Sequence, residues 1–178
     1  MRTSYKVSLG GMIMALSTLC MTATNLFPAA SFALPAIAGF LLIPVNLELG
    51  KKWAFSVYVG VSLLSIFISS DHTAIISFVA FFGYYPIVKG IIEKLRRSVL
   101  EWIIKILLLN CAILVGILIT LAFFGFEMLL LEYGEFGKIG ILVYILCLNG
   151  AFVIFDIALT RMITLIILKF IPLLKKIK

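Results

Sequence analysis

The sequence predicts an all-α, polytopic membrane protein, with six transmembrane helices forming one domain over residues 1–178. Three observations support this prediction. Of the 178 residues, 63% are hydrophobic and only 13% are charged, too few polar residues to cover a soluble domain. The apolar residues form stretches about as long as a helix needs to cross a hydrocarbon core of roughly 30 Å. The basic residues, finally, fall almost entirely on alternate loops.

Each predicted helix is a long apolar run between short polar segments, because a backbone in lipid must satisfy its own hydrogen bonds. Arg2 and Lys6 precede the first run and resemble the start of a secretory signal, but Leu19 stands before Cys20, where a lipoprotein cleavage site needs a small residue. The first run is therefore predicted to span. The second contains Pro44. The six runs are residues 7–24, 32–49, 53–69, 73–88, 100–124 and 139–170.

The connections between the runs complete the predicted topology. An amphipathic linker covers residues 89–98, a longer loop covers residues 126–138, and a basic tail covers residues 173–178. Fourteen of the 15 basic residues fall on one side, and only Lys138 falls on the other. Basic loops stay in the cytoplasm, so both termini are predicted to be cytoplasmic in a multi-pass plasma membrane protein. The net charge of +7 is thus a topology signal, and its spread over four stretches argues against nucleic-acid binding.

Ionisable residues near the cytoplasmic ends of the runs are predicted to form one charged layer. An ionisable group at membrane depth is costly, so each is a candidate functional residue. The favoured interpretation is a structural ion-pair lock between helices. The alternatives are a proton or ion relay through Asp156, or a contact with a substrate. The layer consists of Glu48, Lys89, Lys105, Asp156 and Arg161.

A second set of polar residues forms the candidate solute-binding group. Asp71 and His72 lie in the second outer loop, where His72 is either a solvated turn residue or a ligand contact. Asn149 shares a helix face with Asp156, seven residues on. The full group is Asn25, Asp71, His72, Tyr84, Asn110 and Asn149.

Small residues in the first run form a possible helix-packing face. Gly11 and Ala15 are four residues apart, so they form a small-xxx-small pair that lets another helix approach closely. The approaching helix belongs either to this chain or to a docking partner. Internal packing is the interpretation for Gly39, Gly60 and Gly83.

The sequence carries no pattern typical of an enzyme. Asp156 is the only membrane aspartate, whereas an intramembrane aspartyl protease needs two, and neither a nucleophile elbow nor a phosphate loop is present. The three cysteines stand singly in apolar runs and lack metal-ligand spacing. We therefore predict neither enzymatic activity nor a bound metal or cofactor.

The layout resembles the substrate-binding S components of energy-coupling factor transporters. The similarity rests on six helices in about 180 residues, cytoplasmic termini, the GMIMA sequence of residues 11–15, and two stretches, ALPAIAG at 33–39 and FGYYPI at 82–87. The family's groove is alanine-based, and here glycine replaces its first alanine. The resemblance implies capture of a vitamin, metal or other micronutrient from outside, in a pocket built by helices four to six and the outer loops. It also implies docking through the first helix on a transmembrane coupling subunit driven by two ATPases. The alternative function is a membrane scaffold or assembly subunit that binds proteins and no solute.

Overall fold

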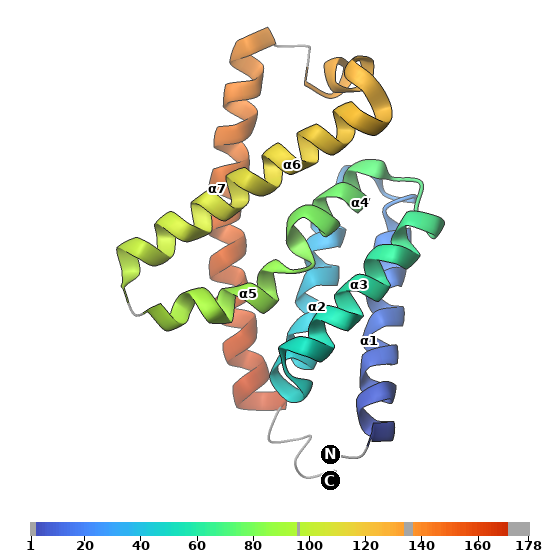
Figure 1. Cartoon of the computed structure of the whole chain (residues 1–178), viewed down its shortest axis with the longest axis vertical. Helices are drawn as coiled ribbons and strands as arrows, with labels where there is room; N and C mark the ends of the chain where they lie inside the picture. Colours follow the sequence, from blue (N-terminus) through green and yellow to red (C-terminus); the bar gives the residue numbers. More distant parts are fainter. Residues whose placement is uncertain (1–2, 96, 134–136, 171–178) are drawn as a thin grey trace. The chain divides into compact units, whose positions relative to one another are not determined.

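The computed structural model describes residues 3–95, 97–133 and 137–170, and these residues form helices without any β-strand (Figure 1). This confirms the all-α prediction. Five described helices are long and apolar enough to cross a membrane: Thr3–Ala23, Lys51–Ile68, His72–Ile92, Ser98–Phe123 and Ile145–Leu168. The apolar helix Ala33–Leu49 is one residue shorter than the shortest of these. It occupies the second of the six predicted runs.

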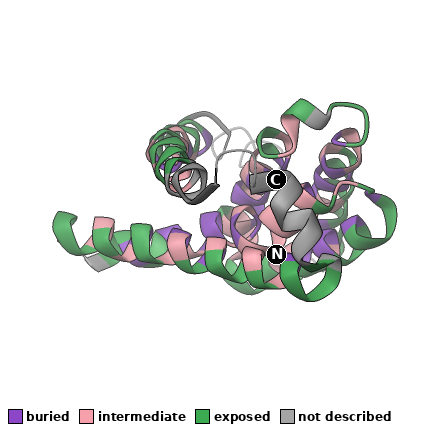
Figure 2. Ribbon diagram, turned by 90° about the horizontal axis from the view of Figure 1, so that it is seen from above, coloured by how far each residue is buried: buried purple, intermediate pink, exposed green. Residues whose placement is uncertain are grey.

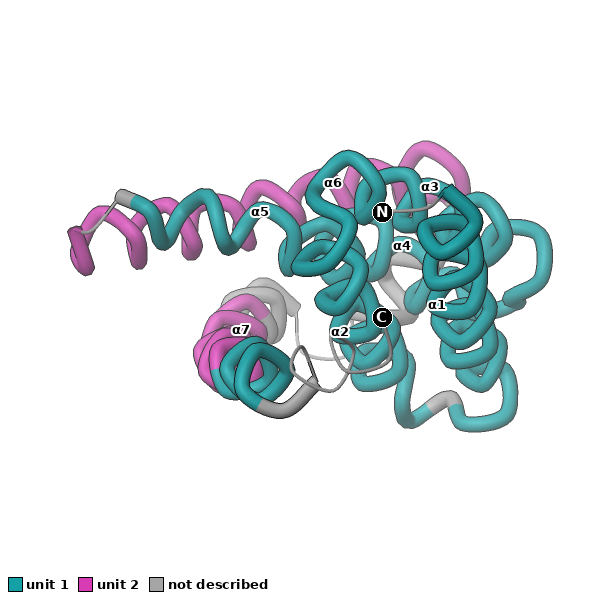
Figure 3. The backbone as a smooth tube through the Cα atoms, turned by 90° about the horizontal axis from the view of Figure 1, so that it is seen from below, with its two compact units in different colours: residues 1–94, 161–178 teal, residues 95–160 magenta. Residues whose placement is uncertain are grey.

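The chain divides into two compact units (Figure 3). Unit 1 comprises residues 1–94 and 161–178, and unit 2 comprises residues 95–160. The predicted site residues are distributed over both units.

Unit 1 is built around three packed helices: α1 (Thr3–Ala23), α2 (Ala33–Leu49) and α3 (Lys51–Ile68). Gly50, with φ of 87°, joins α2 to α3 in a turn that an L side chain rarely adopts. The shared core contains large apolar side chains from all three helices, among them Met21, Leu42, Val45 and Val61.

Three glycines of unit 1 mark close approaches between helices. A Cβ atom at Gly39 would collide with the backbone carbonyl of Phe82, one at Gly60 with the side chain of Met14, and one at Gly83 with the ring of Tyr58. These contacts confirm the internal-packing interpretation of Gly39, Gly60 and Gly83.

The fourth predicted run is a broken helix, not a continuous one. It consists of α4 (His72–Ser77), a π-helical turn η2 (Phe78–Phe82) and α5 (Tyr85–Ile92). Pro86 has no N–H group, so it cannot donate to the carbonyl of Phe82 four residues earlier. The helix widens before this point, where Gly83 N–H donates to Phe78 O at 2.8 Å. The backbone of Gly39 lies against the Phe82 carbonyl and covers it.

The long helices α6 (Ser98–Tyr133) and α7 (Gly137–Leu165) differ in one respect from the prediction. A loop was expected over residues 126–138, but α6 continues to Tyr133 after an interruption at Gly125, where φ is 78°. Residues 127–133 (EMLLLEY) are mostly strong helix formers, so the chain resumes a helix after the glycine.

The predicted linker 89–98 is also partly helical, since α5 runs to Ile92 and a 3-10 turn follows over Glu93–Leu95.

Many residues of the described helices are exposed (Figure 2). Large apolar side chains are numerous among them. In unit 2, Phe123 is 80% exposed and Ile154 is 72% exposed. Such a surface is stable in hydrocarbon and unfavourable in water. It supports the conclusion that the described helices belong to a membrane protein.

Candidate functional site

Five polar residues from three connecting segments of unit 1 join in one hydrogen-bonded group, which we call the loop cluster: Thr24, Asn25, Ser31, Ser69 and Asp71. The Asp71 backbone N–H, which donates to the Ser69 hydroxyl oxygen at 3.3 Å, links its two halves. The segments follow α1, precede α2 and join α3 to α4. Two of the predicted solute-binding residues, Asn25 and Asp71, thus contribute to a single site although 46 positions separate them in the sequence.

Asn25 holds the end of α1 against the end of α3. Its amide oxygen accepts a hydrogen bond from the Ser69 hydroxyl at 3.2 Å and another from the Ser70 backbone N–H at 2.9 Å. The hydroxyls of Thr24 and Ser69 lie 3.4 Å apart and are both buried. Asn25 itself is exposed, so the cluster extends from the surface into unit 1.

Asp71 caps α4 and binds the segment before α2. One carboxylate oxygen accepts the backbone N–H of Ala74 at 3.0 Å, as an N-cap residue does. The other accepts the Ser31 hydroxyl at 2.6 Å. His72, the first residue of α4, follows directly and is exposed. The structure therefore places Asn25, Asp71 and His72 at the same end of unit 1.

Tyr84 lies elsewhere in unit 1, in an aromatic group around the break in the fourth run. Its ring centroid is 6.3 Å from that of Tyr58 and 6.4 Å from that of Phe81. Phe81 in turn stacks on Tyr85 at 4.7 Å. Twelve residues separate Tyr84 from His72, so these contacts belong to a different level of the helix from the loop cluster.

Asn110 and Asn149 pair with each other in unit 2. The Asn110 amide donates to the Asn149 amide oxygen at 3.2 Å, and the Asn149 amide donates back at 3.4 Å. Each amide also donates to a backbone carbonyl one turn earlier in its own helix, that of Ile106 or Ile145. The pair satisfies the polar groups of both asparagines between two apolar helices.

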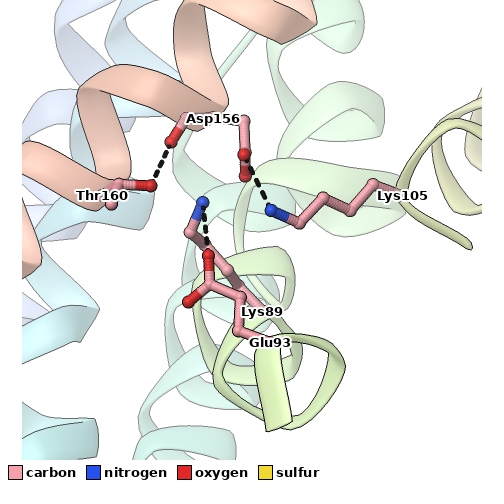
Figure 4. A network of polar contacts seen from close by, with 5 residues as sticks. All are labelled: Lys89, Glu93, Lys105, Asp156 and Thr160. Atoms are coloured by element: carbon pink, nitrogen blue, oxygen red, sulfur yellow. Dashed lines mark hydrogen bonds and ion pairs between the residues drawn. The ribbon is translucent and has the colours of Figure 1, made fainter. Parts of the chain in front are cut away.

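Lys105 and Asp156 form a buried ion pair in unit 2 (Figure 4). The lysine Nζ donates to the aspartate Oδ2 at 2.8 Å, and each side chain is only 5% exposed. Nζ also lies 5.4 Å from the ring centroid of Trp102, a cation–π distance. Thr160 donates its hydroxyl to the Asp156 backbone carbonyl at 2.9 Å. The pair joins α6 to α7.

The other members of the predicted charged layer have different surroundings. Lys89, fully buried in unit 1, pairs with Glu93 at 3.2 Å, one turn along the chain. Glu48 is partly buried, and Arg161 is exposed. Glu93 was missed by the sequence analysis, although its position four residues after Lys89 is a known spacing for helical ion pairs.

Gly11 and Ala15 lie on an exposed face of α1. A Cβ atom at Gly11 would meet no other atom within 4 Å. In the described part of the chain, this pair is therefore not an internal packing contact, unlike Gly39, Gly60 and Gly83.

Fold and sites together define a helical protein of the membrane type, with one polar cluster between connecting segments and one buried ion pair between long helices. Among the described residues, no group of three or more His, Cys, Asp or Glu side chains is arranged to hold a metal ion. Comparisons with protein-family models, curated proteins and solved structures find no match to this chain.

Proposed function

We propose that this chain is the membrane-embedded substrate-binding subunit of a micronutrient uptake transporter. It captures a small solute from outside the cell and docks on a transmembrane coupling subunit driven by two ATPases. The observation that carries this proposal is the exposed Gly11–Ala15 face of α1, which has open space where a packed glycine would have a neighbour. A face of small residues admits a partner helix at close range.

The proposal requires six spans with both termini in the cytoplasm of a plasma membrane protein. Besides the five long helices, α2 has 17 residues, the lower limit for a span. The positions of the basic residues support the orientation. Single cysteines in a background without Cys20, Cys111 and Cys147 test it. We expect protection from external reagents at positions 51, 96 and 178, and labelling at 71 and 132. External labelling at 96 with protection at 132 would contradict this topology.

In this orientation the loop cluster faces outside, and it supports a solute site. Asn25 and His72 are exposed beside Asp71. The amide oxygen of Asn25 is occupied by Ser69 and Ser70, so its NH₂ group is the part that a ligand's acceptor atom can use. Asn110, Asn149 and Tyr84 remain predicted solute contacts outside this cluster.

A thermal-shift screen of the purified protein against vitamins and metal ions tests solute binding. A solute that raises the melting temperature of the parent is expected to lose this effect in Asn25→Ala or His72→Ala. Asn46→Ala, which removes an amide from α2, serves as the matched control and should keep it. If no compound shifts the melting temperature, the solute-binding proposal fails.

Docking is tested by filling the Gly11–Ala15 face. Gly11→Leu with Ala15→Leu should hold a partner helix away and abolish co-purification of a coupling subunit. Insertion into the membrane should be unaffected, because leucine is as compatible with lipid as alanine. The control is Val7→Leu with Met12→Leu, since both parent residues are large, apolar and exposed on the same helix. If the filled variant still retains the same partner, docking occurs on another face.

The second candidate is a membrane scaffold or assembly subunit that binds protein partners and no solute. The internal hydrogen bonds of the loop cluster favour it, because both Asp71 carboxylate oxygens are used within the chain, one to cap α4 and the other to bind Ser31. A scaffold would lose its partner in the filled variant and show no thermal shift with any compound. A transporter subunit would lose its partner and keep the thermal shift.

A further inference from the structure

The end of unit 1 that carries the loop cluster is rich in exposed apolar side chains. In the segment after α1, Leu26 is 77% exposed and Phe27 is 62% exposed. At the end of α3, Phe67 is 84% exposed and Ile68 is 52% exposed. We call these four residues the apolar rim. Large apolar side chains gathered at one exposed end of a protein mark an interaction surface.

Hydrogen bonds of the loop cluster hold the two halves of the apolar rim side by side. The amide oxygen of Asn25 accepts the Ser69 hydroxyl at 3.2 Å and the Ser70 backbone N–H at 2.9 Å. Two rim residues directly follow Asn25 in the sequence, and the other two directly precede Ser69. The rim therefore lies around the polar cluster, at a single end of unit 1.

This end of unit 1 has very few charged side chains. Residues 23–35 contain none, and residues 66–73 contain only Asp71, followed by His72. Both carboxylate oxygens of Asp71 already accept hydrogen bonds, from the Ala74 backbone N–H and from the Ser31 hydroxyl. Charged residues normally occupy the water-facing surface of a protein. Their scarcity here favours an apolar environment for the rim.

The backbone after α1 is also suited to an apolar environment. The N–H of Asn25 donates to Thr22 O at 3.1 Å. The N–H groups of Leu26 and Phe27 both donate to Ala23 O, at 3.1 and 3.2 Å. An unbonded N–H group is costly in hydrocarbon. The two rim residues of this segment can therefore contact acyl chains without exposing an unsatisfied backbone donor.

The lengths of α1 and α3 place the apolar rim near the edge of the hydrocarbon core. Gly10 of α1 faces Val57 of α3, and the far ends of both helices meet at the loop cluster, so the helices run in the same direction. The last basic residues before the two apolar runs are Lys6 and Lys52. A core of roughly 30 Å takes about 20 helical residues, which end at about positions 26 and 72 when counted from these lysines.

We propose that the apolar rim is a lipid-binding surface, in which Leu26 and Phe27 insert among the acyl chains next to the headgroups and hold the loop cluster at the membrane surface. The partner is the bilayer itself, because the rim continues the exposed apolar surfaces of α1 and α3 along the chain. The proposal does not rest on the transport function. A scaffold would have the same lipid contact, and a solute screen without any thermal shift would leave it unaffected.

Tryptophan fluorescence of the full chain in lipid vesicles tests this contact. Trp53→Phe with Trp102→Phe removes the two native indoles, and Leu26→Trp or Phe27→Trp then supplies the only one. Because both parent side chains are more than half exposed, either new indole fits without repacking of the core. The vesicles are phosphatidylcholine with bromine on the acyl chains, either near the headgroup or near the chain end. Iodide serves as the water-soluble quencher.

Both variants should lose most of their fluorescence to bromine near the headgroup, less to bromine near the chain end, and little to iodide. The matched control is Phe67→Trp, at an exposed position within α3, which brominated lipid should quench whether or not Leu26 and Phe27 insert. Strong quenching of both variants by iodide, without loss to brominated lipid, would mean that the segment after α1 faces water. Protection from both quenchers would mean that protein covers the rim. Either result overturns the lipid-binding surface.

Discussion

Removal of the Asp156 carboxylate is the most informative perturbation of unit 2. The change strands Lys105, whose Nζ lies 2.8 Å from the carboxylate and whose side chain is 5% exposed. At this burial, solvent cannot stabilise the remaining charge. Breaking a buried pair in this way costs about 3–5 kcal/mol in soluble proteins. For a chain of this length, each kcal/mol lowers the melting temperature by about 2–4 °C, so Asp156→Ala should melt about 6–20 °C below the parent.

The measurement is the melting temperature of detergent-purified variants. Lys105→Met in the Asp156→Ala background removes the stranded charge and should restore most of the loss, because an apolar replacement of both partners is often neutral. Lys52→Met serves as the control, since Lys52 is exposed and its loss should have little effect. If Asp156→Ala melts like the parent and abolishes solute uptake, the structural interpretation is wrong and a relay or ligand role gains support.

Two further predictions concern unit 1 and use the same melting assay. Gly39→Ala should destabilise the protein by about 1–3 kcal/mol, because the new Cβ would collide with the Phe82 carbonyl. Gly11→Ala, where the new Cβ meets no other atom within 4 Å, should be neutral or stabilising. Equal effects of the two substitutions would contradict the internal-packing assignment of Gly39. Asp71→Ala should cost about 2–4 kcal/mol, since it removes the α4 cap and the bond from Ser31. Asp71→Asn keeps one acceptor oxygen and replaces the other with an NH₂ donor, so its stability should fall between that of Asp71→Ala and that of the parent.

The sequence predicted the helices because hydropathy acts over whole segments. In lipid, an uninterrupted apolar run satisfies its backbone hydrogen bonds as a helix, and its length fixes the approximate bounds of that helix. The errors arose at single residues with special backbone behaviour. Pro86 breaks the fourth run, and near this break the backbone of Gly39 packs against the Phe82 carbonyl, a contact between helices that the sequence does not reveal. Gly125 interrupts α6 without ending it, because helix formers follow.

The sequence predicted how deep the candidate site residues lie along their helices, but not which of them pair with one another. Charge positions along each run placed Lys105 and Asp156 at similar levels, and the structure brings them together. Sequence position does not tell which face of one helix meets which face of another. The sequence therefore did not reveal that Asn110 and Asn149, which were predicted as solute contacts, are hydrogen-bonded to each other.

The contacts of the glycines in unit 1 also provide a physical argument for the docking proposal. Glycine destabilises a helix by about 1 kcal/mol relative to alanine, and a close contact that excludes a side chain offsets this cost. Gly39 and Gly83 have such contacts, since a larger residue would strike a neighbouring backbone or ring. Gly11 has none in the described structure, and it faces outward with Ala15. Lipid chains gain nothing from a glycine, because they adapt to any apolar side chain. A rigid partner helix could approach α1 more closely at a glycine and so form more packing contacts with it. The Gly11–Ala15 face is therefore the part of α1 where we expect a docking partner to stabilise the helix most.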